Sequence, residues 1–247
     1  MELSDIRVVL SRPSESGNVG AVCRAMKNMG LSRLRIVAPE APMDESVILA
    51  RSVHAEELWT QAEHHRTLAE AVADCSIVIG TTRRRGKKRK DFTLTPEETA
   101  TYLRNQQGTA AIVFGNERTG LEAAELQLCT LASHIPASDV FPSLNLSHAA
   151  QIYFYELYTT LSTEGAAKAD AKHWVPVDMA TISTLTELIL ETLGAVGFYT
   201  QAGKEDQRLF FRDLLARTAL TVDEYRYLEG IVQKARKLFT SALDKDP

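Results

Sequence analysis

An amide, a carboxylate and two glycines follow directly after one continuous apolar run in the sequence. The run Ala110–Phe114 breaks into Gly115-Asn116-Glu117 and then into Gly120-Leu121. Buried parallel strands have unbroken apolar runs because both faces of the sheet are covered, and ligands bind beyond the carboxyl ends of such strands. We therefore predict that a strand delivers Asn116 and Glu117 to the edge of a binding site. An ordinary strand–turn–helix connection is the alternative interpretation.

A second candidate group combines an amide, a glycine and an arginine. Asn18, Gly20 and Arg24 follow shortly after the apolar run Ile6–Leu10. Asn18 is a good residue to cap a helix, and the free N–H groups at a helix N-terminus bind anions. A guanidinium near that end can hold a phosphate through two hydrogen bonds. The pattern predicts an anion site at Asn18 and Arg24, and the alternative is a surface arginine on an amphipathic helix.

The third candidate segment has the sequence FPSLNLS and ends at Ser147. Its proline and Ser143 predict a turn, and Asn145 or Ser143 can cap the long helix that follows. A cap alone accounts for the amide of Asn145, but it does not explain why Leu144 and Leu146 bracket it so closely.

Seven basic residues within eight positions dominate the charge distribution. The formal net charge of the chain is −4, and without these seven residues it would be −11. They are Arg83, Arg84, Arg85, Lys87, Lys88, Arg89 and Lys90. A concentrated basic loop on an otherwise acidic protein indicates a surface that faces phosphate groups. A solvated charge run is the alternative interpretation.

Strand-like and helix-like segments alternate along the first two thirds of the chain, which predicts a mostly parallel sheet with helices on both faces. The expected strands are Ile6–Leu10, Leu34–Val37, Ser76–Gly80, Ala110–Phe114 and Ala132–Ile135. The expected helices are Asn18–Met29, Asp44–Ser52, Thr67–Ala73, Pro96–Asn105, Glu122–Cys129 and Asn145–Ser162. Thr95 and Glu98 form a capping-box pattern around Pro96.

The character of the sequence changes after residue 163. The segment 164–178 is small and polar and contains Pro176, so we interpret it as a linker. Beyond it, three helical patterns follow one another without a strand, and Thr221 and Glu224 form another capping-box pattern. We expect an α/β domain over residues 1–163 and an all-helical extension over residues 179–247.

Composition and motifs exclude several classes of protein. The six histidines lack ligand spacing with any cysteine or carboxylate, so we expect no metal, and His64 and His65 are expected on a helix surface. The three cysteines form no C-x-x-C pair. There is no apolar run long enough to span a membrane and no secretory signal, so a cytoplasmic location is expected. A G-x-S-x-G elbow, a Walker loop and a G-x-G-x-x-G fingerprint are all missing.

Three motifs in order resemble the SPOUT class of RNA methyltransferases, in its SpoU (TrmH-like) branch. They are NVGAVCR at Asn18–Arg24, FGNERTGL at Phe114–Leu121 and PSLNLS at Pro142–Ser147. The resemblance covers about residues 6–161. The helical tail makes the layout most similar to bacterial members that methylate the ribose 2′-OH of nucleotide thirty-two in the tRNA anticodon loop.

The resemblance implies a parallel sheet whose C-terminal third is tied into a trefoil knot, which is a rare exception to ordinary chain topology. It implies S-adenosylmethionine as the methyl donor, with its adenine near Leu144 and Ile135, and a homodimer with each site at the subunit interface. The matching donor-binding positions are Thr81, Thr82, Arg83, Gly115, Ile135, Ser143, Leu144 and Asn145.

The resemblance also implies that Asn18, Arg24, Glu117 and Asn145 line the reacting end of the site. Family proposals make the matching arginine a general base. A guanidinium with a pKa above about 12 is not readily deprotonated, so we favour Arg24 as a clamp on the adjacent phosphate. The basic residues Arg84, Arg85, Lys87, Lys88, Arg89 and Lys90 are expected to bind tRNA phosphates, and no DNA or membrane partner is expected.

Three alternatives stay open. One is a ribosomal RNA ribose methyltransferase of the same class, although the first strand near Ile6 leaves no room for a preceding RNA-binding domain. Another is a non-catalytic RNA-binding protein that keeps the fold, against which the intact Asn18, Arg24, Glu117 and Asn145 speak. The last is a generic doubly wound nucleotide-binding protein, which the missing glycine fingerprint disfavours.

Overall fold

The computed structural model describes residues 1–83, 93–162, 175–199 and 203–243, without the side chains of 240–243. The chain divides into two compact units, Met1–His173 and Trp174–Pro247, and each is described by itself. Most of the expected linker, residues 164–174, lies outside the described part of the chain. The domain boundaries predicted at 163 and 179 therefore stay predictions.

The first unit is built on a seven-stranded sheet in which all strand pairs are parallel. In space the strand order is β3-β2-β1-β6-β4-β7-β5. The strands are β1 Ile6–Ser11, β2 Arg33–Val37, β3 Glu63–His65, β4 Ile77–Thr81, β5 Thr93–Leu94, β6 Ala110–Phe114 and β7 Leu131–Ser133. The central strand β6 is fully buried, as its unbroken apolar sequence predicted.

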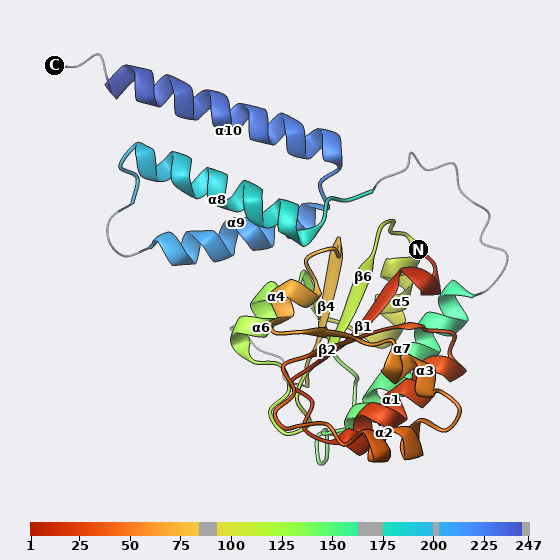
Figure 1. Ribbon diagram of the computed structural model, residues 1–247. Coiled ribbons are helices and arrows are strands. Elements are labelled where there is room, and N and C mark those ends of the chain that lie inside the picture. Colours follow the sequence, from red (N-terminus) through yellow and green to blue (C-terminus); the bar gives the residue numbers. More distant parts are fainter. Residues whose placement is uncertain (84–92, 163–174, 200–202, 244–247) are drawn as a thin grey trace. The chain divides into compact units, whose positions relative to one another are not determined.

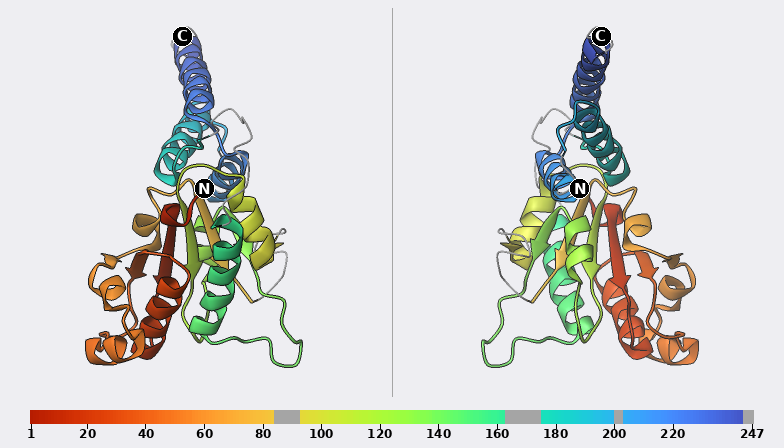
Figure 2. Two further views of the ribbon diagram at one scale, coloured as in Figure 1. Left: turned by 90° about the vertical axis from the view of Figure 1, so that its right-hand side faces the viewer. Right: turned by 90° about the vertical axis from the view of Figure 1, so that its left-hand side faces the viewer.

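Helices cover both faces of this sheet (Figure 1), so the predicted α/β class is confirmed. Besides a short 3-10 turn at Leu3–Asp5, the helices are α1 Ser16–Asn28, α2 Glu45–Ser52, α3 Glu56–Thr60, α4 Leu68–Ala71, α5 Pro96–Arg104, α6 Ala123–Leu128 and α7 Leu146–Leu161. Helices α4 and α6 lie on one face of the sheet, and the other five cover the opposite face, where α7 packs against α1 and α5 (Figures 1 and 2). The trefoil knot stays a prediction, because residues 84–92 between β4 and β5 are not described.

Two local predictions were wrong. Helix α1 begins at Ser16 after the N-cap residue Glu15, so Asn18 lies inside the first turn rather than at the cap. Its side chain binds a distant carboxylate instead, as described below. His64 and His65 lie on the edge strand β3, not on a helix. Pairing with β2 makes this segment a strand. A strand of three residues is too short to show a periodic pattern in the sequence.

Two helix starts follow the predicted capping chemistry. The Thr95 hydroxyl accepts from the Glu98 N–H at 3.2 Å, and the Glu98 carboxylate accepts from the Thr95 N–H at 2.7 Å. Asn145 caps α7, because its side-chain oxygen accepts from the Ser147 N–H at 2.8 Å. These caps satisfy N–H groups that would otherwise lack a partner within the helix.

Aromatic packing joins α7 to the central strand. The Phe114 ring meets Tyr153 and Phe154 edge to face, at centroid distances of 5.6 and 5.9 Å. The buried Tyr153 hydroxyl donates to the Ser133 hydroxyl at 2.8 Å. Strand β6 and helix α7 are thereby held together at the edge of the sheet where β6 ends.

In its described part, the second unit contains three helices, α8 Met179–Ala195, α9 Lys204–Thr218 and α10 Val222–Leu243. Helix α8 packs against both others, and ion pairs join Arg208 to Glu187 at 2.6 Å and Arg236 to Glu191 at 3.1 Å. No helix among the described residues is long and apolar enough to cross a membrane.

Candidate active site

A cavity of about 420 Å³ lies beyond the carboxyl ends of β4, β6 and β7. This is the edge where parallel sheets bind ligands. Four segments line it, namely 81–83, 114–121, Ile135 and 142–144, together with Leu146, Ala149 and Tyr153 of α7. The segments are far apart in the sequence, and the parallel sheet brings their strand ends to one place.

Seven of the eight predicted donor-binding residues line this cavity, and the exception is Asn145. The lining residues among them are Thr81, Thr82, Arg83, Gly115, Ile135, Ser143 and Leu144. Asn145 instead caps α7 next to the cavity. Both leucines that bracket Asn145 line the cavity. Leu146 is also buried in the core, whereas Leu144 is exposed.

The loop after β6 folds back on itself and forms one wall of the cavity. The Gly120 N–H donates to the Asn116 carbonyl at 2.8 Å, and the Asn116 side-chain oxygen accepts from the N–H groups of Arg118 and Thr119. A Cβ atom on Gly115 would lie 2.2 Å from the Leu121 nitrogen. Gly120 has a φ of +68°, a conformation that favours glycine. Both glycines are therefore required by the shape of this loop.

The Glu117 carboxylate joins this loop to the start of α1. It accepts from the Ser14 N–H at 2.9 Å, from the Ser14 hydroxyl at 2.8 Å, and from the Asn18 amide at 3.2 Å. Burial by itself would raise the pKa of Glu117, but the bonds from Ser14 and Asn18 outweigh it and hold this pKa below its ordinary value. Glu117 is therefore an anchored carboxylate rather than a poised acid.

A chain of polar contacts continues from Glu117 to α7. The Asn145 amide donates to the Asn18 side-chain oxygen at 2.8 Å, while Asn18 donates to Glu117. Three of the four predicted reacting-end residues thus form one connected group beside the cavity. Each comes from a different one of the three sequence motifs.

Arg24 is the predicted reacting-end residue that the structure does not bring to this group. Its side chain lies exposed on α1, outside the cavity lining. The assignment of Arg24 to the reacting end therefore stays a prediction. Arg24 and Asn18 are six positions apart, which places them on different faces of a helix.

The residues that were predicted to bind tRNA phosphates lie outside the part of the chain that the structure describes. Arg84, Arg85, Lys87, Lys88, Arg89 and Lys90 all belong to the segment 84–92. Arg118 was not among the predicted residues, although it lines the cavity and donates to Glu40 at 3.2 Å. Its position directly after Glu117 was the available signal.

Within the described ranges, no cluster of three or more His, Cys, Asp or Glu side chains could hold a metal ion.

The fold and this three-motif site define a class. The family model for the "SpoU rRNA Methylase family" matches residues 5–155, and the chain belongs to this family of methyltransferases. The membership predicted from the three motifs is thereby confirmed.

Individual relatives extend the match beyond the catalytic unit. The Pseudomonas aeruginosa protein "tRNA (cytidine/uridine/adenosine-2′-O-)-methyltransferase TrmJ" is 35% identical over 96% of this chain and 95% of its own length. The corresponding Yersinia enterocolitica TrmJ is 33% identical over 95% of this chain and 93% of its own. These alignments span nearly the whole chain, so the predicted similarity to bacterial members of the family is confirmed beyond residue 161 as well.

Solved structures agree with this placement. The crystal structure of TrmJ from Z. mobilis ZM4 has a TM-score of 0.78 and 30% identity, covering 92% of this chain and 97% of that one. A probable methylase family protein from Haemophilus influenzae has a TM-score of 0.64 and 32% identity, covering 97% of this chain and 99% of that one.

Proposed function

We propose that this protein transfers a methyl group from S-adenosylmethionine to a ribose 2′-OH of tRNA, at nucleotide thirty-two of the anticodon loop. The observation that carries the proposal is the cavity at the carboxyl edge of the sheet, which is lined by two of the three family motifs and linked through Glu117 and Asn145 to Asn18 of the remaining motif. The names of the two TrmJ relatives support tRNA and the 2′-oxygen as the target.

The cavity fits the donor in size and in chemistry. Ligand pockets commonly measure about 300–1,000 Å³, and this one measures about 420 Å³. Gly115 lets the loop that forms the cavity wall fold back on itself, since a Cβ atom there would collide with the backbone of Gly120 and Leu121. Leu144 and Ile135 offer apolar surface for the adenine, and backbone groups of the loops around Thr81 and Ser143 offer polar partners.

When bound, S-adenosylmethionine supplies a methyl group on a positively charged sulfur, which a ribose oxygen can displace without further activation of the leaving group. The contribution of the protein is then mainly positioning. Asn18 and Asn145 orient each other through their 2.8 Å hydrogen bond, and Glu117 fixes Asn18. Their place beside the cavity makes them the residues that hold the ribose in line with the methyl group.

Arg24 completes the site from a second copy of the chain. Its exposed guanidinium lies outside the cavity of its own chain, and a homodimer would let the Arg24 of the partner subunit clamp the phosphate next to the target ribose. The guanidinium then stabilises the developing charge on the 2′-oxygen. The proton passes to a neighbouring phosphate oxygen or to water.

Subunit mixing tests this shared site. Arg24→Ala and Gly115→Ala chains, carrying different tags, are each expected to form inactive homodimers. A heterodimer isolated by both tags contains one intact site if sites are shared between subunits, and should recover about half of the wild-type activity. An inactive heterodimer would place Arg24 in the site of its own subunit.

The basic residues between Arg84 and Lys90 are proposed to bind tRNA phosphates. Replacing them with serine should raise the KM for tRNA and flatten the dependence of binding on salt, because each phosphate contact releases counterions. The affinity for the donor, measured by calorimetry, should stay unchanged. A loss of donor affinity would place this segment in the donor site instead.

The reaction is tested by incubating the protein with S-adenosylmethionine and unmodified total tRNA, and then mapping ribose methylation. Methylation at nucleotide thirty-two is the expected result. Methylation of ribosomal RNA but not tRNA would favour the ribosomal alternative. Donor binding without transfer to either RNA would contradict the assignment of Asn18, Glu117 and Asn145 to the reacting end, and no donor binding at all would favour a non-catalytic RNA-binding protein.

A further inference from the structure

Arg12 adopts a backbone conformation that is unusual for a residue with a side chain. It directly follows β1 and has a φ of +52°. Its N–H group donates to the Val37 carbonyl at 2.8 Å, so the chain remains attached to β2 while it turns. Residues in this region of backbone space carry strain, and they persist where surrounding contacts hold them in place. Contacts with neighbouring elements must therefore hold Arg12 in this conformation.

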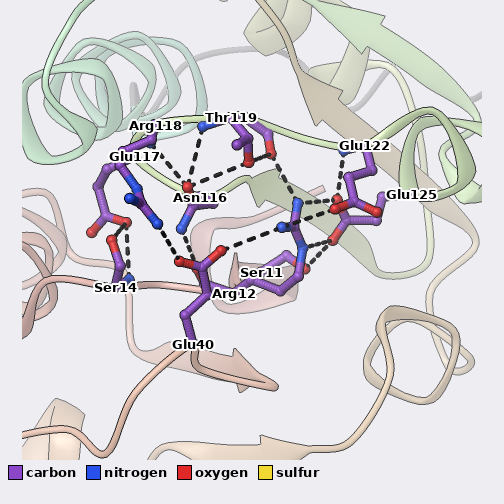
Figure 3. A network of polar contacts seen from close by, with 11 residues as sticks. Ser11, Arg12, Ser14, Glu40, Asn116, Glu117, Arg118, Thr119, Glu122 and Glu125 are labelled. Atoms are coloured by element: carbon purple, nitrogen blue, oxygen red, sulfur yellow. Dashed lines mark hydrogen bonds and ion pairs between the residues drawn. The ribbon is translucent and has the colours of Figure 1, made fainter.

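The Arg12 guanidinium forms a bidentate hydrogen-bonded pair with the carboxylate of Glu125 on α6. The two nitrogen–oxygen distances are 3.1 and 2.8 Å. The Glu125 carboxylate also accepts from the Ser11 hydroxyl at 2.5 Å and from the Glu122 N–H at 2.6 Å. A further ion pair joins Arg12 to Glu122 at 3.1 Å. Figure 3 shows this network between the end of β1 and the start of α6.

Arg12 also bonds to both ends of the loop 116–120, which forms one wall of the cavity. At one end, the Asn116 amide donates to the Arg12 carbonyl at 2.9 Å. At the other end, the guanidinium donates to the Gly120 carbonyl at 3.0 Å (Figure 3). One residue thus connects the two ends of the loop through its backbone and its side chain. Neither Arg12 nor Glu125 lines the cavity itself.

We propose that Arg12, held by Glu125, is a positioning residue that sets the shape of the loop 116–120 and thereby the affinity for the methyl donor. The proposal rests on the proposed function, because it takes the cavity as the donor site. It requires an arginine at this position, since only the planar guanidinium can bind Glu125 with two parallel bonds and still donate to Gly120. A lysine has one charged nitrogen and cannot reproduce this geometry.

The matched control is Arg35, a second arginine of the same sheet. It binds Asp74 with two bonds of 2.6 and 2.9 Å, and it does not line the cavity. Substitution of either arginine by lysine keeps the positive charge and removes a bidentate interaction with a carboxylate. The difference between the two variants therefore isolates the contact with the loop.

The test compares Arg12→Lys, Glu125→Gln and Arg35→Lys in the full-length protein. Donor affinity is measured by calorimetry below the unfolding temperature of each variant, together with kcat and the KM values for donor and tRNA. We expect Arg12→Lys and Glu125→Gln to weaken donor binding by about tenfold or more, because small displacements of a binding wall are costly. The KM for tRNA should stay within about twofold. Arg35→Lys should lower the unfolding temperature and leave donor affinity unchanged.

Hydrogen exchange provides a readout that does not depend on donor binding. The amides of Arg118, Thr119 and Gly120 should exchange faster in Arg12→Lys than in the wild type and in Arg35→Lys. Donor affinity within twofold of the wild type in Arg12→Lys, or an equal loss in Arg35→Lys, would overturn the proposal. A wild-type protein that binds no donor would instead refute the proposed function, so the two failures can be told apart.

Discussion

Arg12 and Arg35 both form bidentate ion pairs, but they do so at opposite edges of the same sheet. Arg12 follows the carboxyl end of β1 and binds Glu125. Arg35 lies on β2, and its partner Asp74 precedes β4, at the amino edge of the sheet. The Arg35 guanidinium also donates to the Ala71 carbonyl at 2.7 Å. Similar chemistry therefore connects secondary structure elements at both edges.

The difference lies in what else each arginine contacts. Arg35 sits in a regular strand and binds groups that only hold the fold together. Arg12 sits in a strained turn and binds a loop of the cavity wall. Ligands bind at the carboxyl edge of a parallel sheet, so an ion pair there can shape a site, whereas one at the amino edge contributes to stability alone.

The electrostatics of the two pairs are also different. The Arg35 guanidinium lowers the pKa of Asp74 to about 2, because it donates two hydrogen bonds to that carboxylate. For Glu125, burial alone would raise the pKa, and the bonds from Arg12 and Ser11 reverse that effect and lower it. Both carboxylates are therefore ionised at neutral pH, and each pair remains charged.

The largest effect is expected for Gly115→Ala at the carboxyl edge. The new Cβ would lie 2.2 Å from the Leu121 nitrogen, so the loop must move away from its present path. Donor binding should fall by about a hundredfold or more, as measured by calorimetry. The control is Gly230→Ala on α10, where nothing lies within 4 Å of the added atom. Unchanged donor affinity in Gly115→Ala would show that the loop does not contact the donor.

Arg24→Ala is expected to lower kcat by about a hundredfold with little change in donor affinity, because the guanidinium acts on the transition state. Single-turnover kinetics with saturating donor measure this directly. Arg24→Lys keeps the charge but cannot bind a phosphate in a bidentate manner, so it should recover only part of the wild-type kcat. Turnover close to that of the wild type in Arg24→Ala would remove this arginine from the reaction.

Asp74→Asn should lower the free energy of unfolding by about 1–2 kcal/mol, a modest figure because half of the Asp74 side chain is exposed to water. Catalysis by the folded protein should be unchanged. The folded-state pKa of Asp74, about 2, lies below its ordinary value of 3.8, so the stabilisation is present above pH 3.8 and is lost as the pH falls towards 2. Urea unfolding of both proteins at pH 6 and at pH 2.5 should show the difference shrinking.

A suitable control for this pH experiment is Asp139→Asn, in an exposed loop. It should change the free energy of unfolding at pH 6 by no more than about 0.5 kcal/mol. If Asp74→Asn instead impaired donor binding, the distinction between the two edges of the sheet would fail.

The smallest effect is expected for Thr95→Ala, which removes a helix cap away from both arginines. Loss of the bond from the Glu98 N–H should cost about 1 kcal/mol of stability and leave kcat and both KM values unchanged. Thermal unfolding measures the first quantity and steady-state kinetics the second. Thr101→Ala, at an exposed position of the same helix, should be neutral by comparison.

Much of the fold could be predicted because its signals are local. The buried strand Ala110–Phe114 is visible as an apolar run, and the caps at Thr95 and Asn145 follow from residue types at fixed spacing. The edge strands β3 and β5 could not be predicted in this way. They are only three and two residues long, and they exist because a neighbouring strand supplies their hydrogen bonds.

The site was predictable in its composition but not in its geometry. The three motifs identify the residues around the cavity, because they contain the glycine, proline, asparagine and serine residues that turns, helix caps and ligand contacts require. The separation of Arg24 from Asn18 and the role of Arg12 have no local signal. The Arg12 contact with Glu125 spans 113 positions of the chain, and its positive φ is not encoded by an arginine.

The amino-acid sequence by itself determined the alternation of strands and helices, the family, and the set of side chains that could form a site, since each depends on short-range patterns of apolar, capping and turn residues. Only the tertiary structure decided which of those side chains meet. Parallel strands bring their carboxyl ends to one edge whatever their distance along the chain, and there Glu117, Asn18 and Asn145 become neighbours. The same assembly set Arg12 against the loop wall and left Arg24 facing outward.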